Sequence, residues 1–513
     1  MSALPYPVQT RHLTLKVWLC VFVYAILAGL AIQLVVLPYM FPQLHAGNGL
    51  LAGRDWVGFH EQAVAHARGI AEGGWNEFRL RPDGDNAITG IAAFFYYLFW
   101  PKPWTLLPLS AAMFATGGVA LFSMLKRLDL EDNEALIAIL PYLVFPSALL
   151  QYGQIHKDVF CTAGVLVTLW SWVSLLRQDR KARQILPLIA ASFIALIVLS
   201  VFRPYFMFPF LMLGVGLLLW HVIRAAWQAF RLLVSRGEVG RRGSLVFNLQ
   251  SVGILVLLNA LVYLMANSFV DVRMKPIPAQ AADPQAHAAK FAVPMVIWQS
   301  NKDVRSADAK RLVTADAAGA DAEAAARKAI EECRPIVVLK EGEYLENLIN
   351  RAFLKIAVAR AGFTSSGGTT AASNIDKGID FCRNEDLVNY IPRAMQIAFF
   401  APFPSKWTAL EKRNSSSVEI YISAVEMFYC YIAYFGLLYW LFSYRRWNVA
   451  LLIPVAFSLG VMLLLGLTVA NVGTLYRMRF PFAMIFISIG MAGILQLAKI
   501  RPPWVEKLDS SAD

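Results

Sequence analysis

Charged residues are scarce in this sequence. Only 16% of its 513 residues are Asp, Glu, Lys or Arg, whereas 58% are hydrophobic. Ordinary soluble domains carry about a quarter charged residues. This composition therefore excludes a purely soluble enzyme and a disordered scaffold, and it indicates a protein that passes through a membrane several times.

The sequence also lacks the common motifs for nucleotide, metal and acyl chemistry. It has no phosphate-binding loop ending in Gly-Lys-Ser or Gly-Lys-Thr, no dinucleotide fingerprint and no Gly-x-Ser-x-Gly turn. His60 and Glu61 are followed by Val64 at the position where a zinc protease has its second histidine. The sequence thus requires no cofactor and supports no metal site, so an activated substrate would supply the energy of any reaction.

Hydrophobic runs long enough to cross a bilayer recur along the chain. We expect an all-α polytopic membrane protein with about ten transmembrane helices and a mainly helical outside domain without a sheet. The expected spans are residues 15–39, 105–125, 135–150, 158–176, 185–202, 205–223, 246–269, 418–442, 449–470 and 480–497. The first run is longer than the core of a signal peptide, so we interpret it as an uncleaved span.

Lysine and arginine outnumber the acids by 47 to 35, which gives a net charge of +12. The positive residues lie mainly in alternate short loops, for example Lys126 with Arg127 and Arg445 with Arg446. Membrane orientation explains this pattern better than nucleic-acid binding does, because positive loops stay in the cytoplasm. The alternation predicts a multi-pass protein with both termini cytoplasmic. We expect its location to be a bacterial inner membrane, and we expect no nucleic-acid partner.

The expected spans divide the chain into four parts. Residues 1–269 form a membrane region of seven spans that includes a first outside loop, residues 40–104. Residues 270–417 form a periplasmic domain, residues 418–497 a second membrane region of three spans, and residues 498–513 a cytoplasmic tail. Cys333 and Cys382 both fall in the periplasmic part, where an oxidising compartment would allow a disulfide between them.

Several charged residues lie at the expected outer ends of the spans, where positive residues are disfavoured. Arg203 precedes Pro204, and Arg479 lies two residues before Pro481. Both arginines therefore stand where a helix is expected to begin, and the unpaired N–H groups of such a start attract anions. Their presence on this side favours a function over an incidental surface charge.

Acidic residues accompany these cations, although each has a structural alternative. Asp55 is a favoured residue for starting a helix, and Lys157 with Asp158 could simply cap a span and extend its charge to the interface. Glu426 lies seven residues after Glu419, on the same face of the eighth span. Carboxylates opposite fixed cations at one membrane surface are nevertheless what a lipid-linked phosphate requires, since guanidinium groups bind phosphate and carboxylates act as bases.

The candidate residues at this outer face are Arg54, Asp55, Glu61, Lys157, Asp158, Arg203, Tyr205, Glu426, Asn471, Arg477 and Arg479.

The pattern resembles the membrane glycosyltransferases of the GT-C superfamily, which include bacterial relatives of the dolichyl-phosphate-mannose protein mannosyltransferases. The resemblance lies in the acid after the first span (residues 53–55), the aromatic run of residues 86–99, the segment of residues 146–158 and the late loop of residues 471–481. Residues 401–407 are also similar to proteins of this kind found in exopolysaccharide clusters.

This resemblance implies transfer of a sugar from a polyprenyl-phosphate donor to a lipid, glycan or protein acceptor on the outer face of the membrane, in cell-envelope or exopolysaccharide synthesis. Asp55 would deprotonate or orient the acceptor, as the catalytic group. Lys157, Arg203, Arg477 and Arg479 would neutralise the leaving phosphate.

Two other functions remain open at this stage. A polysaccharide polymerase or ligase would use the same cations on a lipid pyrophosphate. A transporter or flippase would place ionisable residues near the middle of the bilayer and would often show inverted repeats. Neither feature stands out in the sequence, so transport ranks third.

Overall fold

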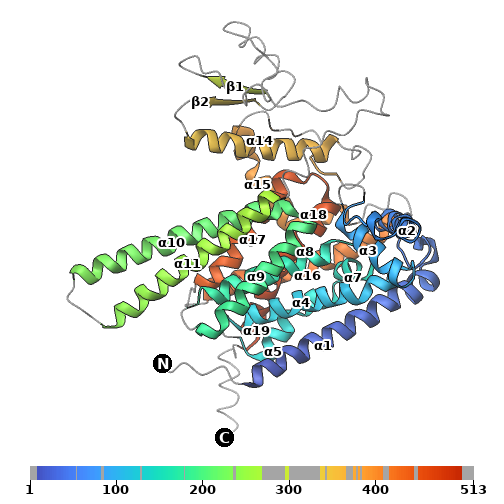
Figure 1. Ribbon diagram of the computed structural model, residues 1–513, viewed down its shortest axis with the longest axis horizontal. Helices are drawn as coiled ribbons and strands as arrows, with labels where there is room; N and C mark the ends of the chain where they lie inside the picture. Colours follow the sequence, from blue (N-terminus) through green and yellow to red (C-terminus); the bar gives the residue numbers. More distant parts are fainter. Residues whose placement is uncertain are drawn as a thin grey trace, which may run out of the picture. The chain divides into compact units, whose positions relative to one another are not determined.

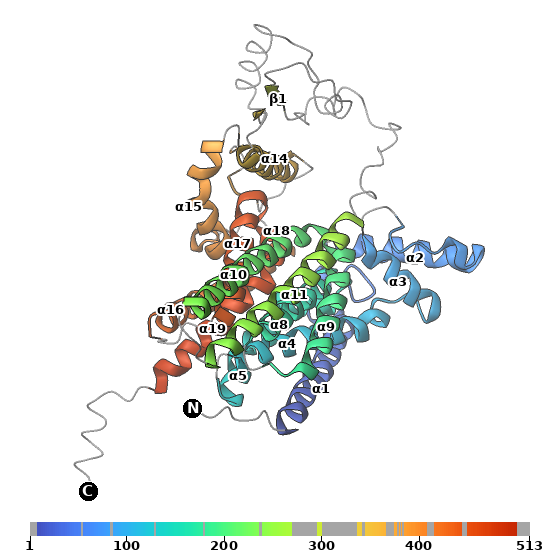
Figure 2. The ribbon, with the colours of Figure 1, turned by 60° about the vertical axis from the view of Figure 1, so that its left-hand side comes forward.

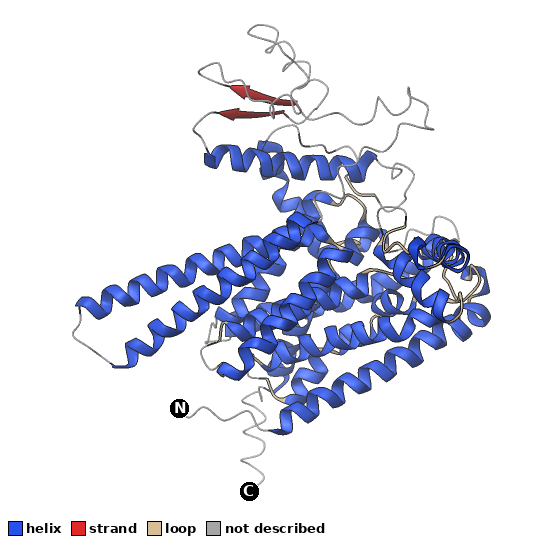
Figure 3. Ribbon diagram, in the orientation of Figure 1, coloured by secondary structure: helices blue, strands red, loops and turns tan. Residues whose placement is uncertain are grey.

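Helices make up nearly all of the structure, a computed structural model of the chain (Figure 3). The residues that it describes are 8–52, 55–82, 86–127, 130–177, 180–234, 239–268, 295–299, 336–340, 344–365, 374–376, 379, 381, 384–407, 415–443 and 449–499. The predicted class, an all-α polytopic membrane protein, is confirmed.

The chain divides into two compact units. The first comprises Met1–Lys275, Pro404–Ser458 and Phe480–Asp513, and the second comprises Pro276–Phe403 and Leu459–Arg479. The second unit thus includes most of the segment predicted as an outside domain, together with a late segment that was predicted as membrane span and loop.

Eight helices among the described residues are long and apolar enough to cross a membrane. They are His12–Met40, Pro103–Lys126, Asp158–Leu175, Ala182–Phe202, Pro204–Leu232, Ser244–Ala266, Ile422–Phe442 and Phe480–Ala498. Eight of the ten predicted spans are therefore confirmed as helices of this kind. The predicted span at residues 449–470 contains a shorter apolar helix, Ile453–Thr468.

The predicted span at residues 135–150 is wrong as a single helix. It is divided into α5 (Asp132–Ala138), α6 (Leu140–Val144) and α7 (Pro146–Gly153). Pro141 and Pro146 lie in the first turns of α6 and α7. Proline cannot donate a backbone hydrogen bond and clashes with the preceding turn, so it starts a helix but does not continue one. Hydropathy alone does not register this interruption.

The first unit contains most of the long helices (Figure 1). Besides the three short helices these are α1 (Val8–Ala31, continued by the π-helical turn Ile32–Met40), α2 (Asp55–Gly73), α3 (Ala87–Leu98), α4 (Leu107–Lys126), α8 (Asp158–Leu175), α9 (Ala182–Phe202), α10 (Met207–Val234), α11 (Val239–Ser268), α16 (Ser415–Ser443) and α19 (Phe480–Lys499). Short 3-10 turns lie at Pro42–Leu44, Trp75–Glu77, Pro103–Leu106, Pro204–Phe206 and Pro404–Lys406.

Helix α8 lies at the centre of the first unit. It packs against α4 on one side and α9 on the other, and α4 in turn packs against α1. Almost every side chain of α8 is buried, including the whole of Leu166 and Trp172. Such a helix is surrounded by protein on all sides and does not face lipid. Its packing holds α8 in one position, and the residues that directly precede α8 are therefore held in position too.

Helices α16 and α19 pack through glycines. A Cβ atom added at Gly490 would lie 1.9 Å from the carbonyl O of Ala433, and one added at Gly493 would lie 2.1 Å from that of Gly436. Small residues allow two membrane helices to approach until their backbones touch, and the resulting van der Waals contact stabilises the pair. The close packing of α16 and α19 therefore requires glycine at both positions.

Two pairs of helices that follow each other in the chain also lie side by side (Figure 2). Helices α10 and α11 form a long hairpin, in which Nδ1 of buried His221 lies 2.8 Å from Oδ1 of Asn248. Helices α2 and α3 form a shorter pair, in which Nδ1 of His60 lies 2.8 Å from the hydroxyl of Tyr96. Helix α3 has 12 residues, which is too few to cross a membrane.

The second unit contains α14 (Tyr344–Ser365), α15 (Asn384–Phe400), α18 (Val472–Met478) and part of α17 (Val449–Thr468). It also has a parallel pair of strands, β1 (Met295–Gln299) and β2 (Ile336–Lys340). The prediction that this region has no sheet is wrong. Both strands are short apolar runs with β-branched residues, which periodicity alone does not separate from helix.

A buried arginine organises the second unit. Arg360 is only 1% exposed, and it donates to the carbonyl O atoms of Ile379 at 2.8 Å and Leu467 at 3.2 Å. Nearby, burial alone would raise the pKa of Asp376, but hydrogen bonds from Arg393 and Tyr390 hold this pKa below its usual range. The network ties the segment around Asp376 to the helices.

The predicted disulfide between Cys333 and Cys382 lies outside the described residues. The other three cysteines, Cys20, Cys161 and Cys430, form no disulfide.

Candidate functional site

The segment that joins α7 to α8 is held in place by the end of the first span and by the loop that follows it. The carbonyl O of Gly153 accepts a hydrogen bond from Nε2 of Gln33 at 2.7 Å. Both ends of the Gln154 side-chain amide are also hydrogen-bonded. Its Oε1 accepts from the N–H of Leu51 and its Nε2 donates to the O of Gly49, both at 3.1 Å. Buried amides with both ends paired define one geometry, so the start of α8 is rigid.

A buried ion pair links α8 to α9 at this point. Arg203, directly after α9, donates to the carboxylate of Asp158, the first residue of α8, and also to the hydroxyl of Tyr205. The side chain of Asp158 is 4% exposed and that of Arg203 is 13% exposed. Nδ1 of His156 lies 3.2 Å from the other carboxylate oxygen. Asp158 therefore orients Arg203 and is not placed to act as a base.

Lys157 supplies a second cation next to this pair. Its Nζ donates to Oδ1 of Asn86 at 2.6 Å, which joins the start of α8 to the residue before α3. Burial lowers the pKa of Lys157 and the adjacent charge of Arg203 lowers it further, while Asp158 and Asp55 act in the opposite direction. The two cations repel each other, so an additional anion would stabilise the charged form of Lys157.

Asp55 lies close enough to this cluster for its charge to act on Lys157. It begins α2, and its side chain is exposed. The next residue, Trp56, packs edge-on against the ring of His156, with ring centroids 6.0 Å apart, and its Nε1 donates to the O of Leu51 at 2.5 Å. An exposed carboxylate thus lies within electrostatic range of Lys157, a partly buried cation. Arg54, the preceding candidate, lies outside the described residues.

Arg81 is a member of this region that the sequence analysis missed. Its guanidinium donates to the carbonyl O of Val201 at 2.5 Å, in the last turn of α9. It thereby holds the outer loop next to Arg203. The signal that could have found it is the one used for Arg203, a positive residue on the side where positive residues are disfavoured. His156 and Gln154 were also missed, since neither belongs to a recognised motif.

We define the outer cluster as Asp55, Asn86, Lys157, Asp158, Arg203 and Tyr205.

Two further predicted acids of the first unit lie in different surroundings. Glu61 is exposed on α2, where its charge raises the pKa of His60, although burial and Lys102 together lower that pKa overall. Glu426 is only 2% exposed, and its Oε1 accepts from the N–H of Ser147 at 2.7 Å. This contact satisfies the N-terminus of α7, which gives Glu426 a structural role.

Arg479 belongs to the second unit and is bound to backbone carbonyls there. It is 3% exposed and donates to the O atoms of Ala398 and Ala401, each at 2.5 Å. These carbonyls stand at the end of α15, where four O atoms lack partners inside the helix. The guanidinium thus closes the end of that helix.

Asn471 and Arg477 lie in the same unit. Oδ1 of Asn471 accepts from the N–H of Thr474 at 2.9 Å and caps α18, while its Nδ2 donates to Oδ1 of Asn374 at 3.0 Å. Arg477 is half-buried on α18. Because these residues and the outer cluster belong to separate units, the expectation that Arg477 and Arg479 act with Asp55 on one leaving phosphate stays a prediction.

No group of three or more His, Cys, Asp or Glu side chains among the described residues is arranged to hold a metal ion. The outer cluster instead offers two cations, Lys157 and Arg203, and the exposed carboxylate of Asp55 acts electrostatically on Lys157. Comparisons with protein-family models, with curated proteins and with solved structures find no match to this chain. Any functional conclusion must therefore rest on the chemistry of the cluster.

Proposed function

We propose that this membrane protein is a glycosyltransferase that moves a sugar from a polyprenyl-phosphate donor to an acceptor at the outer face of a bacterial inner membrane. The observation that carries this proposal is the outer cluster, in which Lys157 and Arg203 are held at the ends of membrane spans and the charge of the exposed Asp55 acts on Lys157. Both termini are proposed to be cytoplasmic, from the alternation of positive loops.

The two cations suit a phosphate that is attached to a lipid. Arg203 is oriented by Asp158, and Lys157 by Asn86, so neither side chain must be ordered when an anion binds. The electrostatic cost of keeping Lys157 charged next to Arg203 falls when a phosphate neutralises both. Since the cluster lies at the ends of hydrophobic helices, a polyprenyl chain would remain in the bilayer while its phosphate reaches the cations.

Asp55 supplies the base in this proposal. Its carboxylate accepts the proton of an acceptor hydroxyl, the hydroxyl oxygen forms a bond to the anomeric carbon, and the bond from that carbon to the phosphate oxygen breaks. The bonding electrons leave with the polyprenyl phosphate, whose negative charge Lys157 and Arg203 stabilise. The acceptor is a lipid, a glycan or a protein.

The test compares lipid-linked sugars in a deletion strain complemented with wild type, Asp55→Asn or Glu72→Gln. Glu72 is an exposed acid on the same helix, so it is the matched control. We expect the sugar-charged polyprenyl phosphate to accumulate in the deletion strain and with Asp55→Asn, but not with wild type or Glu72→Gln. A positioned base contributes about 10²- to 10⁴-fold to the rate.

Purified protein separates binding from transfer. Asp55→Asn should still bind polyprenyl monophosphate as wild type does, because the cations are unchanged, whereas Lys157→Gln should bind it more weakly. Normal lipid-linked sugars in the Asp55→Asn strain, at equal protein levels, would contradict the role of Asp55. Unchanged lipid-linked sugars in the deletion strain would contradict sugar transfer altogether.

A further inference from the structure

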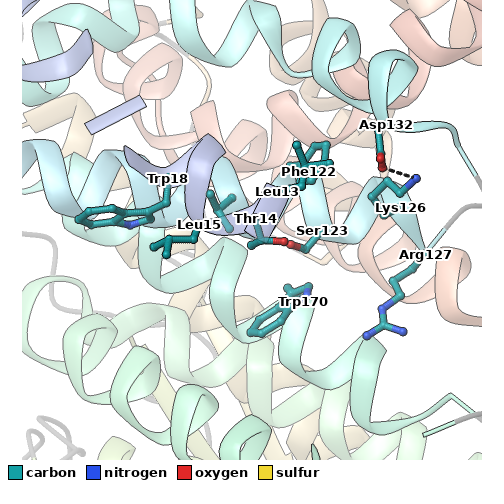
Figure 4. Close-up of a pocket in the computed structure, with 11 residues that line it drawn as sticks. Leu13, Thr14, Leu15, Trp18, Phe122, Ser123, Lys126, Arg127, Asp132 and Trp170 are labelled. Carbon is teal, nitrogen blue, oxygen red and sulfur yellow. Dashed lines mark ion pairs between the residues drawn. The ribbon is translucent and has the colours of Figure 1, made fainter. Parts of the chain in front are cut away.

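A cavity of about 460 Å³ opens in the first unit at the other end of α8 from the outer cluster (Figure 4). Trp170 lines this cavity, and it lies about 18 Å along the helix from Asp158 at 1.5 Å per residue. The remaining lining residues come from α1, α4 with the residue that follows it, and the start of α5, and they include Leu15, Trp18, Phe122, Lys126, Arg127 and Asp132.

The walls of the cavity are mostly apolar and lie at the edge of the helix bundle. Leu15 of α1 is 58% exposed, as expected for a side chain that faces hydrocarbon. Trp18 is fixed by a hydrogen bond from its Nε1 to Oγ1 of Thr116 at 3.1 Å, and its ring stacks on Phe22. A rigid apolar wall beside lipid suits an acyl chain better than it suits a water-soluble metabolite.

The rim of the cavity is positively charged. Lys126 pairs with Asp132 at 2.7 Å, and Arg127 adds a further guanidinium, so the charged lining residues sum to +1 (Figure 4). The neighbouring Glu134 is engaged within α5, where its carboxylate accepts from the N–H of Glu131 at 3.0 Å. Basic pockets between membrane helices bind anionic headgroups, and a guanidinium forms paired hydrogen bonds with phosphate.

We propose that this cavity binds a phospholipid with an anionic headgroup from the cytoplasmic leaflet. The phosphate lies at Arg127 and Lys126, and an acyl chain lies between α1 and α4, along Trp18 and Phe122. The site is independent of the proposed sugar transfer, because its residues lie at the opposite end of α8. The predicted orientation places Lys126 and Arg127 on the cytoplasmic side, where anionic lipids attract positive residues.

The experiment measures lipid binding to the purified full chain by native mass spectrometry. Dioleoyl phosphatidylglycerol is compared with dioleoyl phosphatidylcholine, which has the same chains but no net charge, and with glycerol phosphate, which has the anion but no chains. We expect phosphatidylglycerol to bind best. Arg127→Gln should weaken its binding roughly five-fold, the effect of one basic residue near a membrane surface, and leave phosphatidylcholine binding unchanged.

Two further variants complete the test. Arg183→Gln removes an exposed arginine of the same predicted side outside the cavity and should leave phosphatidylglycerol binding within about two-fold of wild type. Ser123→Trp fills the cavity and should reduce the binding of both lipids. Equal binding of the two lipids by wild type, unchanged phosphatidylglycerol binding by Arg127→Gln, or glycerol phosphate competing as well as the lipid would overturn the proposal.

Discussion

Neutralising Asp158 should destabilise the first unit by removing the partner of a buried cation. Asp158→Asn keeps the shape of the side chain but leaves the guanidinium of Arg203, 13% exposed, without its anion and next to Lys157. Breaking one partner of a buried pair costs about 3–5 kcal/mol. We expect Asp158→Asn to lower the free energy of unfolding by about 3 kcal/mol, the lower limit of this range. The loss is at this limit because the amide oxygen of Asn can still accept a hydrogen bond and Arg203 keeps its hydrogen bond to Tyr205.

The assay is a double-mutant cycle of Asp158→Asn and Arg203→Met, followed by SDS-induced unfolding of the purified protein. Each single change leaves the charge of the other residue without its partner. The loss in free energy of unfolding of the double variant should therefore be about 2 kcal/mol smaller than the sum of the two single losses. Asp132→Asn is the control, since Asp132 is 49% exposed in its pair with Lys126 and should contribute less than about 0.5 kcal/mol. Additive losses in the cycle would refute the buried pairing.

Three other predictions concern packing, acidity and orientation. Gly490→Ala should destabilise the α16–α19 pair by about 1–3 kcal/mol through a backbone clash, whereas Gly253→Ala, with open space around it, should not; SDS unfolding of both variants compares them. Hydrogen bonds lower the pKa of Asp376 below 3.8, so its stabilisation is complete above this pH and is lost as pH falls through the lowered value. Asp376→Asn should therefore be less stable than wild type at pH 6 and differ less at pH 3, as measured by thermal unfolding; an equal difference at both pH values counts against it. Reporter fusions after Arg242 and after Lys310 should report opposite sides of the membrane, and the same side for both would exclude the predicted topology.

The fold class and part of the outer cluster could be predicted from the sequence because both depend on local rules. Hydrophobic length gives the spans, and the distribution of positive residues singles out Arg203 on an unexpected side. That rule also pointed to Lys157, and the structure places the two residues in one charged cluster with Asp158. In each case the informative residue lies at the end of a helix, where its position follows from the span itself.

The remaining contacts depend on tertiary structure and leave no local signal. The role of Arg479 follows from carbonyls about 80 residues earlier in the chain, at Ala398 and Ala401. Similarly, the buried position of Glu426 follows from its contact with Ser147. The sequence alone does not show whether a charged side chain contacts a substrate or a backbone group. For this reason the sequence analysis grouped Arg479 and Glu426 with the residues of the outer cluster.

The contact between Glu426 and Ser147 also has a consequence for biosynthesis, since 279 residues separate its two partners. The first half of the chain leaves the ribosome and inserts long before α16 is synthesised. The N–H of Ser147 in α7 therefore lacks its acceptor, Oε1 of Glu426, until late in translation. Unpaired N–H groups inside a membrane are costly. A nascent chain that stops before α16 is therefore incomplete in its early half as well, and we expect it to be a preferred target of membrane quality-control proteases.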